Sequence, residues 1–279
     1  MNEYQAIRNK FILPNAREDW TVFRNALTDL LLEAHAGRIA VVGAGRCCDI
    51  DLHRLAAASE HVLLLDVDEE SMREAVSALP AELQEKTELR AASITGIQES
   101  DVEKFIDEML TYVRYHGRNL SAEMIRLRMN ESLDRIAAKL PETEQDLAHI
   151  LPEGSVDLLL CSGVHSQLFS VILFFIRSLF HSLKVMVEHV DMVETEVLDR
   201  IRSMNDQVIP VINDALYSAA GQMVIFGNEY MEQDPVEGAY QCIRHIREKY
   251  TPDEIHLSWE FNRSEGVIYD MLMQVCRKL

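Results

Sequence analysis

The sequence predicts an α/β protein with a Rossmann-like, doubly wound sheet of seven strands that ends in an antiparallel hairpin. Three observations lead to this prediction. Short apolar runs alternate with amphipathic helical segments, which is typical of parallel strands joined by helices. The first run leads directly into the turn Gly43-Ala44-Gly45 and then a helix. The last two runs are separated by a short turn-like segment, which favours an antiparallel pair at the sheet edge.

The expected strands are seven apolar runs, at 39–42, 62–65, 89–92, 156–161, 222–227, 255–261 and 266–275. The expected helices carry apolar residues at helical spacing, at 23–31, 52–58, 69–79, 100–113, 125–140, 167–183, 190–207 and 240–246. Ser100 and Glu103 have the spacing of a capping box for the helix that follows. Pro210 is expected to begin a new helix, because proline is favoured at the first helical position.

These elements divide the chain into an N-terminal helical segment, 1–37, and a Rossmann-like domain, 38–279. The strand–helix alternation pauses at about residue 98, and only helical patterns follow until the run at 156–161. We therefore expect a helical insertion at about 98–150, between the third and fourth strands.

The charge balance excludes several classes of partner. The chain has 27 Lys and Arg against 46 Asp and Glu, a formal net charge of −19. Such a negative field repels phosphate backbones and anionic lipid surfaces. We therefore expect a small-molecule substrate, no nucleic acid and no membrane, with a homodimer as one candidate assembly.

The cysteine pattern predicts a reducing compartment. There are five cysteines, an odd number, and they form no C-x-x-C pair. A disulfide framework and a structural zinc site are therefore not expected, and no metal site is predicted. The N-terminus lacks the pattern of a secretory signal, and the apolar stretch "LFSVILFFIRSLF" is too short to span a bilayer. We expect a cytoplasmic protein.

Polar and small residues follow three of the expected strands, and in a doubly wound sheet this is where ligands bind. Gly43 and Gly45 allow a tight turn and close approach of a ligand to the backbone, although an ordinary structural turn is the alternative. Asp66 ends the second strand, where an acid accepts hydrogen bonds from both ribose hydroxyls. The alternative for Asp66 is a helix cap, a role that Asp68 fits better. The loop "CSGVHSQL", 161–168, follows the fourth strand, with Ser166 as an expected helix cap.

These segments resemble the class I S-adenosylmethionine-dependent methyltransferases. The segment "VVGAGRCCDIDL" resembles the first motif of the family, and "LLLDVD" resembles its acidic second motif. The loop after the fourth strand and the closing hairpin resemble the corresponding regions. The first motif departs from the family pattern at Cys47, where the family has a third glycine. No D/N-P-P-Y/F signature follows the fourth strand, which argues against methylation of DNA bases.

The resemblance implies S-adenosylmethionine as cofactor, with S-adenosylhomocysteine as product, and it implies roles for individual residues. Those expected near the methionine part and the transferring methyl group are Gly43, Ala44, Gly45, Cys161, Ser162 and Gly163, with Asp49 or Asp51 holding the ammonium group. Those expected around the adenosine are Asp66 on the ribose and Val67, Ser93 and Ile94 around the adenine.

Methyl transfer also needs an aligned nucleophile and, for many acceptors, a base. His165 is the predicted base, because an imidazole titrates near neutral pH, and Gln167 is predicted to orient the acceptor. The alternative for His165 is a solvated loop histidine. Two other functions stay open on the same residues: an NAD-dependent oxidoreductase, and a non-catalytic module that binds the cofactor or assembles with partners.

Overall fold

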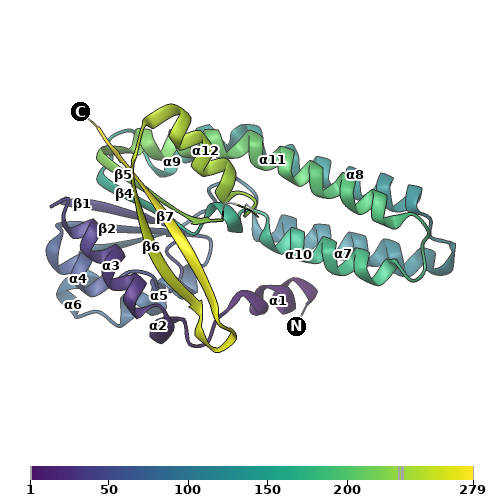
Figure 1. Ribbon diagram of the computed structural model, residues 1–279, viewed down its shortest axis with the longest axis horizontal. Helices are drawn as coiled ribbons and strands as arrows, with labels where there is room; N and C mark the ends of the chain where they lie inside the picture. The colour runs from purple at the N-terminus through teal and green to yellow at the C-terminus, as the bar shows by residue number, and fades with distance from the viewer. Residues whose placement is uncertain (1, 232, 234–235, 279) are drawn as a thin grey trace.

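A computed structural model describes residues 2–231, 233 and 236–278. Its centre is a seven-stranded sheet in the order β3-β2-β1-β4-β5-β7-β6 (Figure 1). The first five strands of the chain run parallel, and β7 pairs antiparallel with both β5 and β6. The strand order therefore confirms the predicted fold class, including the antiparallel terminal hairpin that the resemblance to class I methyltransferases implies.

The strands are close to the predicted apolar runs: β1 Arg38–Val42, β2 His61–Asp66, β3 Thr87–Ala91, β4 Val156–Ser162, β5 Ala220–Tyr230, β6 Asp253–Asn262 and β7 Val267–Arg277. The central residues of β1, β2, β4 and β5 are buried on both faces, as continuous apolar runs in a covered parallel sheet require, whereas the edge strands β3 and β6 are largely half-buried or exposed. From β1 the strand order continues to β2 and β3 on one side, and the chain then returns to place β4 on the other side of β1. The switch point of the sheet therefore lies between β1 and β4. The carboxyl ends of β1, β2 and β4 therefore meet at the point where ligands bind in sheets of this kind.

Helices cover both faces of the sheet: α1 Glu3–Arg8, α2 Ala16–Asp19, α3 Thr21–Leu32, α4 Leu52–Ala58, α5 Glu69–Ser77, α6 Ala81–Gln84, α7 Glu99–His116, α8 Ala122–Ala137, α9 Thr143–Ile150, α10 Ser170–Leu183, α11 Val190–Ala219 and α12 Ala239–Tyr250. Alternate residues of β1 point into two separate cores. Ala40 and Val42 pack with residues of α7 to α12, whereas Ile39 and Val41 pack with residues of α3, α4 and α5.

An aromatic cluster fixes α2 and α3 to the terminal hairpin. Trp20 packs edge-on against Trp259 at a centroid distance of 4.8 Å, and Phe23 stacks on Trp259 at 5.1 Å. The Trp20 indole N–H donates to the backbone carbonyl of Phe261 at 2.8 Å. The N-terminal segment is therefore divided, because α1 lies apart from this cluster, beside α7 and α10 (Figure 1).

The helical insertion contains three helices, α7, α8 and α9, where two were predicted. It does not stand alone. The helices α7 and α8 pack against α10 and α11, and together these four form an arm that extends from the sheet (Figure 1). In the described chain, one segment, His165–Leu183, is long and apolar enough to cross a membrane by length and composition alone, and 39% of its window is buried inside the fold. Ile176 and Phe180 on its inner face are fully buried in the core of the arm.

Three predicted boundaries were wrong. Pro210 lies inside a continuous α11 rather than at the start of a new helix, because packing of α11 against α8, α9, α10 and α12 outweighs the one lost backbone hydrogen bond. The capping box of α7 is Gln98 with Asp101, not Ser100 with Glu103. Ser166 caps no helix: its hydroxyl donates to the Glu229 carboxylate at 2.9 Å.

Candidate functional site

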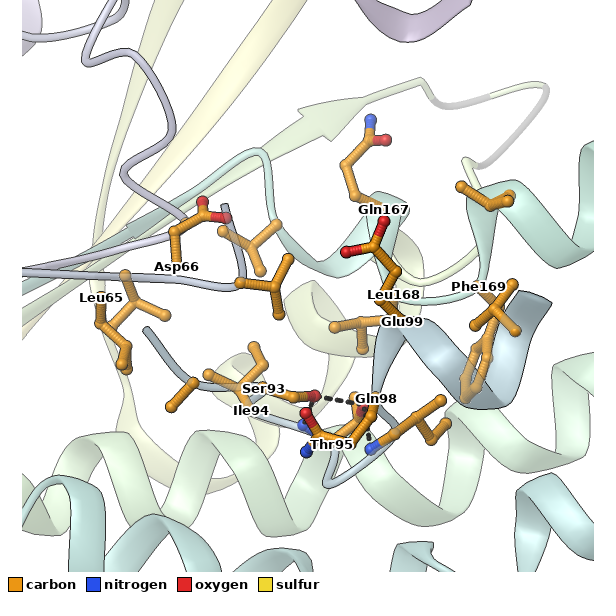
Figure 2. A pocket seen from close by; sticks show the side chains of 18 of the residues that line it. Leu65, Asp66, Ser93, Ile94, Thr95, Gln98, Glu99, Gln167, Leu168 and Phe169 are labelled. Atoms are coloured by element: carbon orange, nitrogen blue, oxygen red, sulfur yellow. Dashed lines mark hydrogen bonds between the residues drawn. The ribbon is translucent and has the colours of Figure 1, made fainter. Parts of the chain in front are cut away.

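A pocket of about 290 Å³ lies at the carboxyl ends of β1, β2 and β4 (Figure 2). Its walls come from the loops that follow these strands and from the loop after β3, with α1, α7 and α10 closing the far side. The lining residues that the sequence predicted are Gly43, Asp66, Val67, Ser93, Ile94, Gly163 and Gln167. The strand order alone brings these residues together, since they are spread over more than 120 positions of the chain.

Asp66 joins two of the walls. Its Oδ2 accepts a hydrogen bond from the Gly45 backbone N–H at 2.9 Å, and its Oδ1 accepts one from the Asp68 backbone N–H at 2.9 Å. A carboxylate has about four acceptor positions, so each oxygen keeps one for a ligand hydroxyl. Asp68, rather than Asp66, caps α5 by accepting from the Ser71 N–H at 3.0 Å. The helix-cap role predicted for Asp68 is therefore confirmed, and the ribose role of Asp66 stays a prediction.

In the glycine turn, an added Cβ would have room at Gly45 but not at Gly43. Both have positive φ, 73° at Gly43 and 45° at Gly45, where a side chain would strain the backbone. A Cβ at Gly45 would meet only the Asp66 Oδ2, at 4.0 Å, so a ligand has room there. A Cβ at Gly43 would lie 2.3 Å from Cγ2 of Val164. The expected close approach of the methionine part to Gly43 is therefore limited by the Val164 side chain.

Cys47 takes the place of the third family glycine without filling the pocket. Its φ is 52°, the left-handed conformation that glycine adopts most easily. Its side chain is 8% exposed and packs in the core beneath α3 and α4, where burial raises the pKa of the thiol. For a residue with a Cβ the left-handed backbone costs roughly 1–2 kcal/mol, which the burial of the side chain offsets.

Ser93 and Ile94 line the wall that follows β3. The Ser93 hydroxyl lies 3.1 Å from the Thr95 hydroxyl and accepts from the Thr95 backbone N–H at 3.2 Å (Figure 2). Beyond them the pocket is apolar, with Val102 of α7 and Phe169 and Ile172 around α10. The pocket is therefore lined by the carboxylates of Asp66 and Glu99, by small hydroxyls along one wall and by apolar side chains between them.

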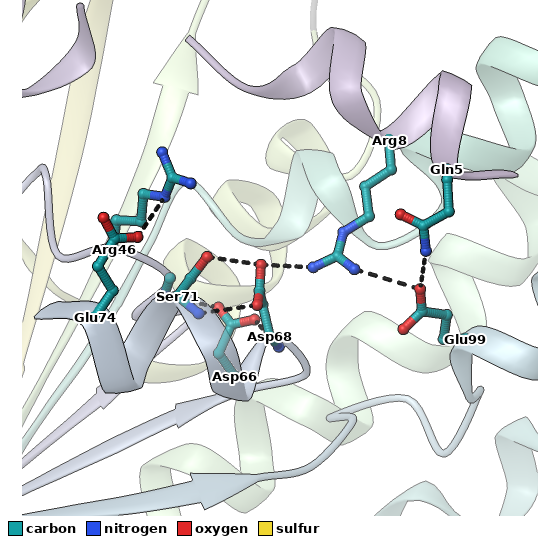
Figure 3. Close-up of polar contacts among 9 residues, drawn as sticks. Gln5, Arg8, Arg46, Asp66, Asp68, Ser71, Glu74 and Glu99 are labelled. Atoms are coloured by element: carbon teal, nitrogen blue, oxygen red, sulfur yellow. Dashed lines mark hydrogen bonds and ion pairs between the residues drawn. The ribbon is translucent and has the colours of Figure 1, made fainter. Parts of the chain in front are cut away.

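The first helix of the chain covers this pocket. Tyr4 of α1 lines the pocket and is 9% exposed. The Arg8 guanidinium lies 2.5 Å from Asp68, in the loop after β2, and 3.3 Å from Glu99, at the start of α7 (Figure 3). Burial opposes ionisation of Asp68, but hydrogen bonds from Ser71 and Arg8 lower the pKa of its carboxyl.

Six of the predicted cofactor residues do not line the pocket, and one of them, Gly45, lies in the glycine turn with its N–H on Asp66. The carboxylate of Asp51 caps α4 by accepting from the Arg54 N–H at 3.0 Å. Burial raises the pKa of the Asp49 carboxyl to about 6, although the nearby Arg24 partly offsets the effect. The other three belong to the sheet or the turn beneath it: Ala44 and Cys161 are buried in the two cores, and Ser162 lies beside Gly227 of β5.

His165 is not placed as a general base. A base must come within hydrogen-bond reach of the acceptor, yet this imidazole is 1% exposed and does not line the pocket. Its Nε2 lies 2.8 Å from the Asn213 Oδ1 on α11, and burial lowers its pKa to about 4. The neutral ring thus belongs to a buried polar cluster with Asn213, Asn228 and Cys242. Gln167, two residues later, is exposed at the pocket rim (Figure 2).

Except for Tyr4, the sequence did not predict the residues that close the pocket, namely Arg8, Glu99, Val102, Phe169 and Ile172. The helices that carry these residues were predicted, but a helical pattern does not indicate which part of the sheet the helix will cover. A local signal exists for Tyr4, because the aromatic residues of segment 1–37 are candidates for the wall of a substrate pocket. There is none for the contacts of α1, which join residues 60 to 101 positions apart.

No protein-family model matches the sequence, and no curated protein matches it. Among solved structures, the chain is similar to the bifunctional kinase-methyltransferase WbdD, at 12% identity and a TM-score of 0.45 over 98% of this chain. It spans about half of WbdD, 46% of that chain. It is also similar to the magnesium protoporphyrin IX methyltransferase of Synechocystis PCC 6803, solved with bound S-adenosylmethionine, at 10% identity and a TM-score of 0.43 over 99% of this chain and 89% of that one.

A third similar structure is the O-methyltransferase TomG of Streptomyces achromogenes, also solved with S-adenosylmethionine. The identity is 12% and the TM-score 0.43, over 100% of this chain and 91% of that one. These values are too low to transfer an activity or an acceptor. The fold assignment therefore depends on the strand order of the chain itself.

Proposed function

We propose that this chain binds S-adenosylmethionine in the pocket at the ends of β1, β2 and β4 and transfers its methyl group to a small-molecule acceptor. The observation that carries the proposal is the joint lining of one pocket by Gly43, Asp66 and Ser93, which follow three neighbouring strands. A nucleoside needs acceptors for its ribose hydroxyls and an apolar slot for its base. The pocket offers both in the expected order.

The residues present fit the nucleoside part of the cofactor. Asp66 keeps acceptor positions for the ribose hydroxyls after its two backbone hydrogen bonds are made. Val67 and Ile94 supply apolar surface for the adenine, and Ser93 supplies a hydroxyl at its edge. The open space at Gly45 leads toward the methionine end.

Asp49 remains the better of the two predicted partners for the ammonium group, since Asp51 caps a helix. Its raised pKa reflects a carboxylate that burial has deprived of water. A cation beside it would restore the ionised form. This role is part of the proposal, because Asp49 does not line the pocket itself.

Bound S-adenosylmethionine supplies an electrophilic methyl group on a sulfonium sulfur. What the chain contributes is alignment and exclusion of water. Gln167, at the rim, has a carboxamide that donates and accepts hydrogen bonds and would orient an acceptor. The net charge of −19 favours a neutral or cationic acceptor over a polyanion. The five cysteines are free thiols, in keeping with a reducing compartment, and we propose a cytoplasmic location.

Calorimetric titration with S-adenosylhomocysteine tests the proposal, with NAD titrated in parallel. We expect micromolar affinity for S-adenosylhomocysteine and no heat with NAD. Binding of NAD alone would replace the proposal with a dinucleotide-dependent oxidoreductase, which also uses an acid at the position of Asp66. Binding of neither ligand would reject a cofactor role for the pocket.

A further inference from the structure

The way α1 is attached suggests a role in ligand binding. This helix has six residues, too few to be stable alone, so its position depends on its contacts. Only Tyr4 and Ile7 are buried, and Tyr4 faces the pocket. Its other contacts are polar: Asn2 donates to Glu103 at 2.8 Å, Gln5 donates to Glu99 at 3.0 Å, and Arg8 pairs with Asp68 and Glu99.

Arg8 is the one side chain that joins both walls of the pocket to α1 in the described chain. Asp68 follows Asp66 and Val67, which line one wall, whereas Glu99 lines the other. Each ion pair is only partly buried, with 29% of the Arg8 side chain exposed. Contacts of this kind hold an element in place yet break at low cost, which is what a moving cover requires.

We propose that α1 is a latched cover of the adenosine pocket, in which Tyr4 packs against the adenine and Arg8 holds the helix closed by bridging Asp68 and Glu99. The inference rests on the proposed function for the identity of the ligand. The Tyr4 hydroxyl hydrogen bonds with Glu99, at the start of α7, and both residues line the pocket together with Ser93 and Ile94 of the loop after β3. Because the proposed function puts the adenine beside this loop, Tyr4 is expected to contact the base rather than the methionine end.

Two further features agree with this arrangement. Burial and the neighbouring Glu99 carboxylate raise the pKa of the Tyr4 hydroxyl to about 12, so the phenol stays a neutral donor toward Glu99 and presents an uncharged ring to the pocket. The segment after α1 reaches α2 through Phe11 and Ile12, which are 41% and 47% exposed. Phe11 contacts Phe174 of α10 edge-on at a centroid distance of 5.9 Å, so lifting α1 would break this contact while α2 and α3 stay fixed by the aromatic cluster.

The latch is tested with Arg8→Gln in the full chain. The matched control is Arg38→Gln, which breaks the ion pair with Asp157 at 2.8 Å, at the amino ends of β1 and β4 and thus away from the pocket. We expect Arg8→Gln to raise hydrogen exchange of the α1 amides in the ligand-free protein at least fivefold. We also expect the dissociation rate of S-adenosylhomocysteine to rise at least fivefold, and Arg38→Gln to change neither quantity. Unchanged exchange and dissociation in Arg8→Gln would overturn the latch.

The adenine contact is tested with Tyr4→Ala, with Tyr4→Phe as the variant that keeps the ring. Adenosine alone is titrated beside S-adenosylhomocysteine. We expect Tyr4→Ala to lower the affinity for both ligands by the same factor, at least fivefold. We expect Tyr4→Phe to retain most of the affinity. Loss confined to S-adenosylhomocysteine would place Tyr4 at the methionine end and overturn the assignment.

These measurements separate this inference from the proposed function. Normal binding of S-adenosylhomocysteine by Tyr4→Ala and Arg8→Gln would reject the cover and leave the cofactor assignment standing. Binding of adenosine without S-adenosylhomocysteine by the wild-type chain would reject S-adenosylmethionine and keep the adenosine site under α1. Binding of neither would reject both.

Discussion

The Asp66 carboxylate is held by the glycine turn that faces it: its Oδ2 accepts the Gly45 backbone N–H at 2.9 Å. This hydrogen bond joins the ends of β1 and β2 across the parallel pair. The turn is tied to β2 a second time, because the Gly43 N–H donates to the Leu65 carbonyl at 2.8 Å. The two motifs that the sequence suggested are therefore one physical unit, and the variants below disturb its parts separately.

Asp66→Ala is expected to weaken the binding of S-adenosylhomocysteine at least about tenfold, which corresponds to a loss of roughly 1.4 kcal/mol in binding free energy. The reason is the loss of the acceptor for the ribose hydroxyls. The control is Asp157→Ala. Asp157 also accepts a backbone N–H, from Arg38 at 2.8 Å, but it lies at the amino end of β4, away from the pocket. Calorimetry measures the affinities and thermal unfolding measures the stability. Equal affinity in folded Asp66→Ala and wild type would remove the ribose assignment.

Gly45→Ala is expected to lower the affinity for S-adenosylhomocysteine as well as the stability of the fold. The new methyl group occupies the space beside Asp66, and the φ of 45° adds backbone strain of roughly 1 kcal/mol. Gly154→Ala is the matched control, since Gly154 has a φ of 64° and nothing within 4 Å of an added Cβ. Both variants should lose similar thermal stability, and only Gly45→Ala should lose affinity. A similar affinity in both variants would put the ligand away from the turn.

Gly43→Ala is expected to destabilise the fold by about 2–4 kcal/mol, because its Cβ would lie 2.3 Å from Cγ2 of Val164 at a φ of 73°. The double variant Gly43→Ala/Val164→Ala removes the obstructing methyl groups and should recover part of the loss. Urea unfolding of the two single variants, the double variant and wild type measures the coupling. Strict additivity would show that Val164 does not restrict Gly43.

His165 makes stability depend on pH with a definite sign. Burial lowers its pKa from 6.5 to about 4, so below pH 6.5 the unfolded chain binds a proton that the folded chain excludes. The stability from the neutral ring is complete above pH 6.5 and is lost as the pH falls toward 4. The loss is on the order of 3 kcal/mol over that range. Asp49 acts in the opposite direction, because its raised pKa of about 6 makes the folded chain bind a proton first.

His165→Gln isolates the histidine contribution. Urea unfolding from pH 7 to pH 4.5 should show a smaller loss of stability in His165→Gln than in wild type. The pH dependence of turnover, once an acceptor is known, should carry no inflection from this residue. A wild-type curve that coincides with that of the variant would mean that the imidazole titrates normally and reaches solvent.

The sequence by itself determined the sheet and most of its helices. Each of the seven apolar runs became a strand, because buried strands and amphipathic helices leave a periodic signal within windows of a few residues. It also predicted that Gly43, Asp66 and Ser93 lie together, since the order of strand–helix units brings them to the carboxyl ends of neighbouring strands. The capping of α5 by Asp68 was predicted from its local pattern as well, whereas the hydrogen bond of Asp66 with Gly45, 21 residues away, was not.

Only the tertiary structure decided what surrounds that edge. It buried His165 against Asn213, 48 residues away, and so removed the predicted base from the pocket. It turned the Cys47 side chain into the core, kept Pro210 inside α11, and joined the insertion with α10 and α11 into one arm. It placed Tyr4 and Arg8 over the pocket. These outcomes depend on packing between distant segments, and a local pattern of hydrophobic and charged residues does not encode which surfaces will meet.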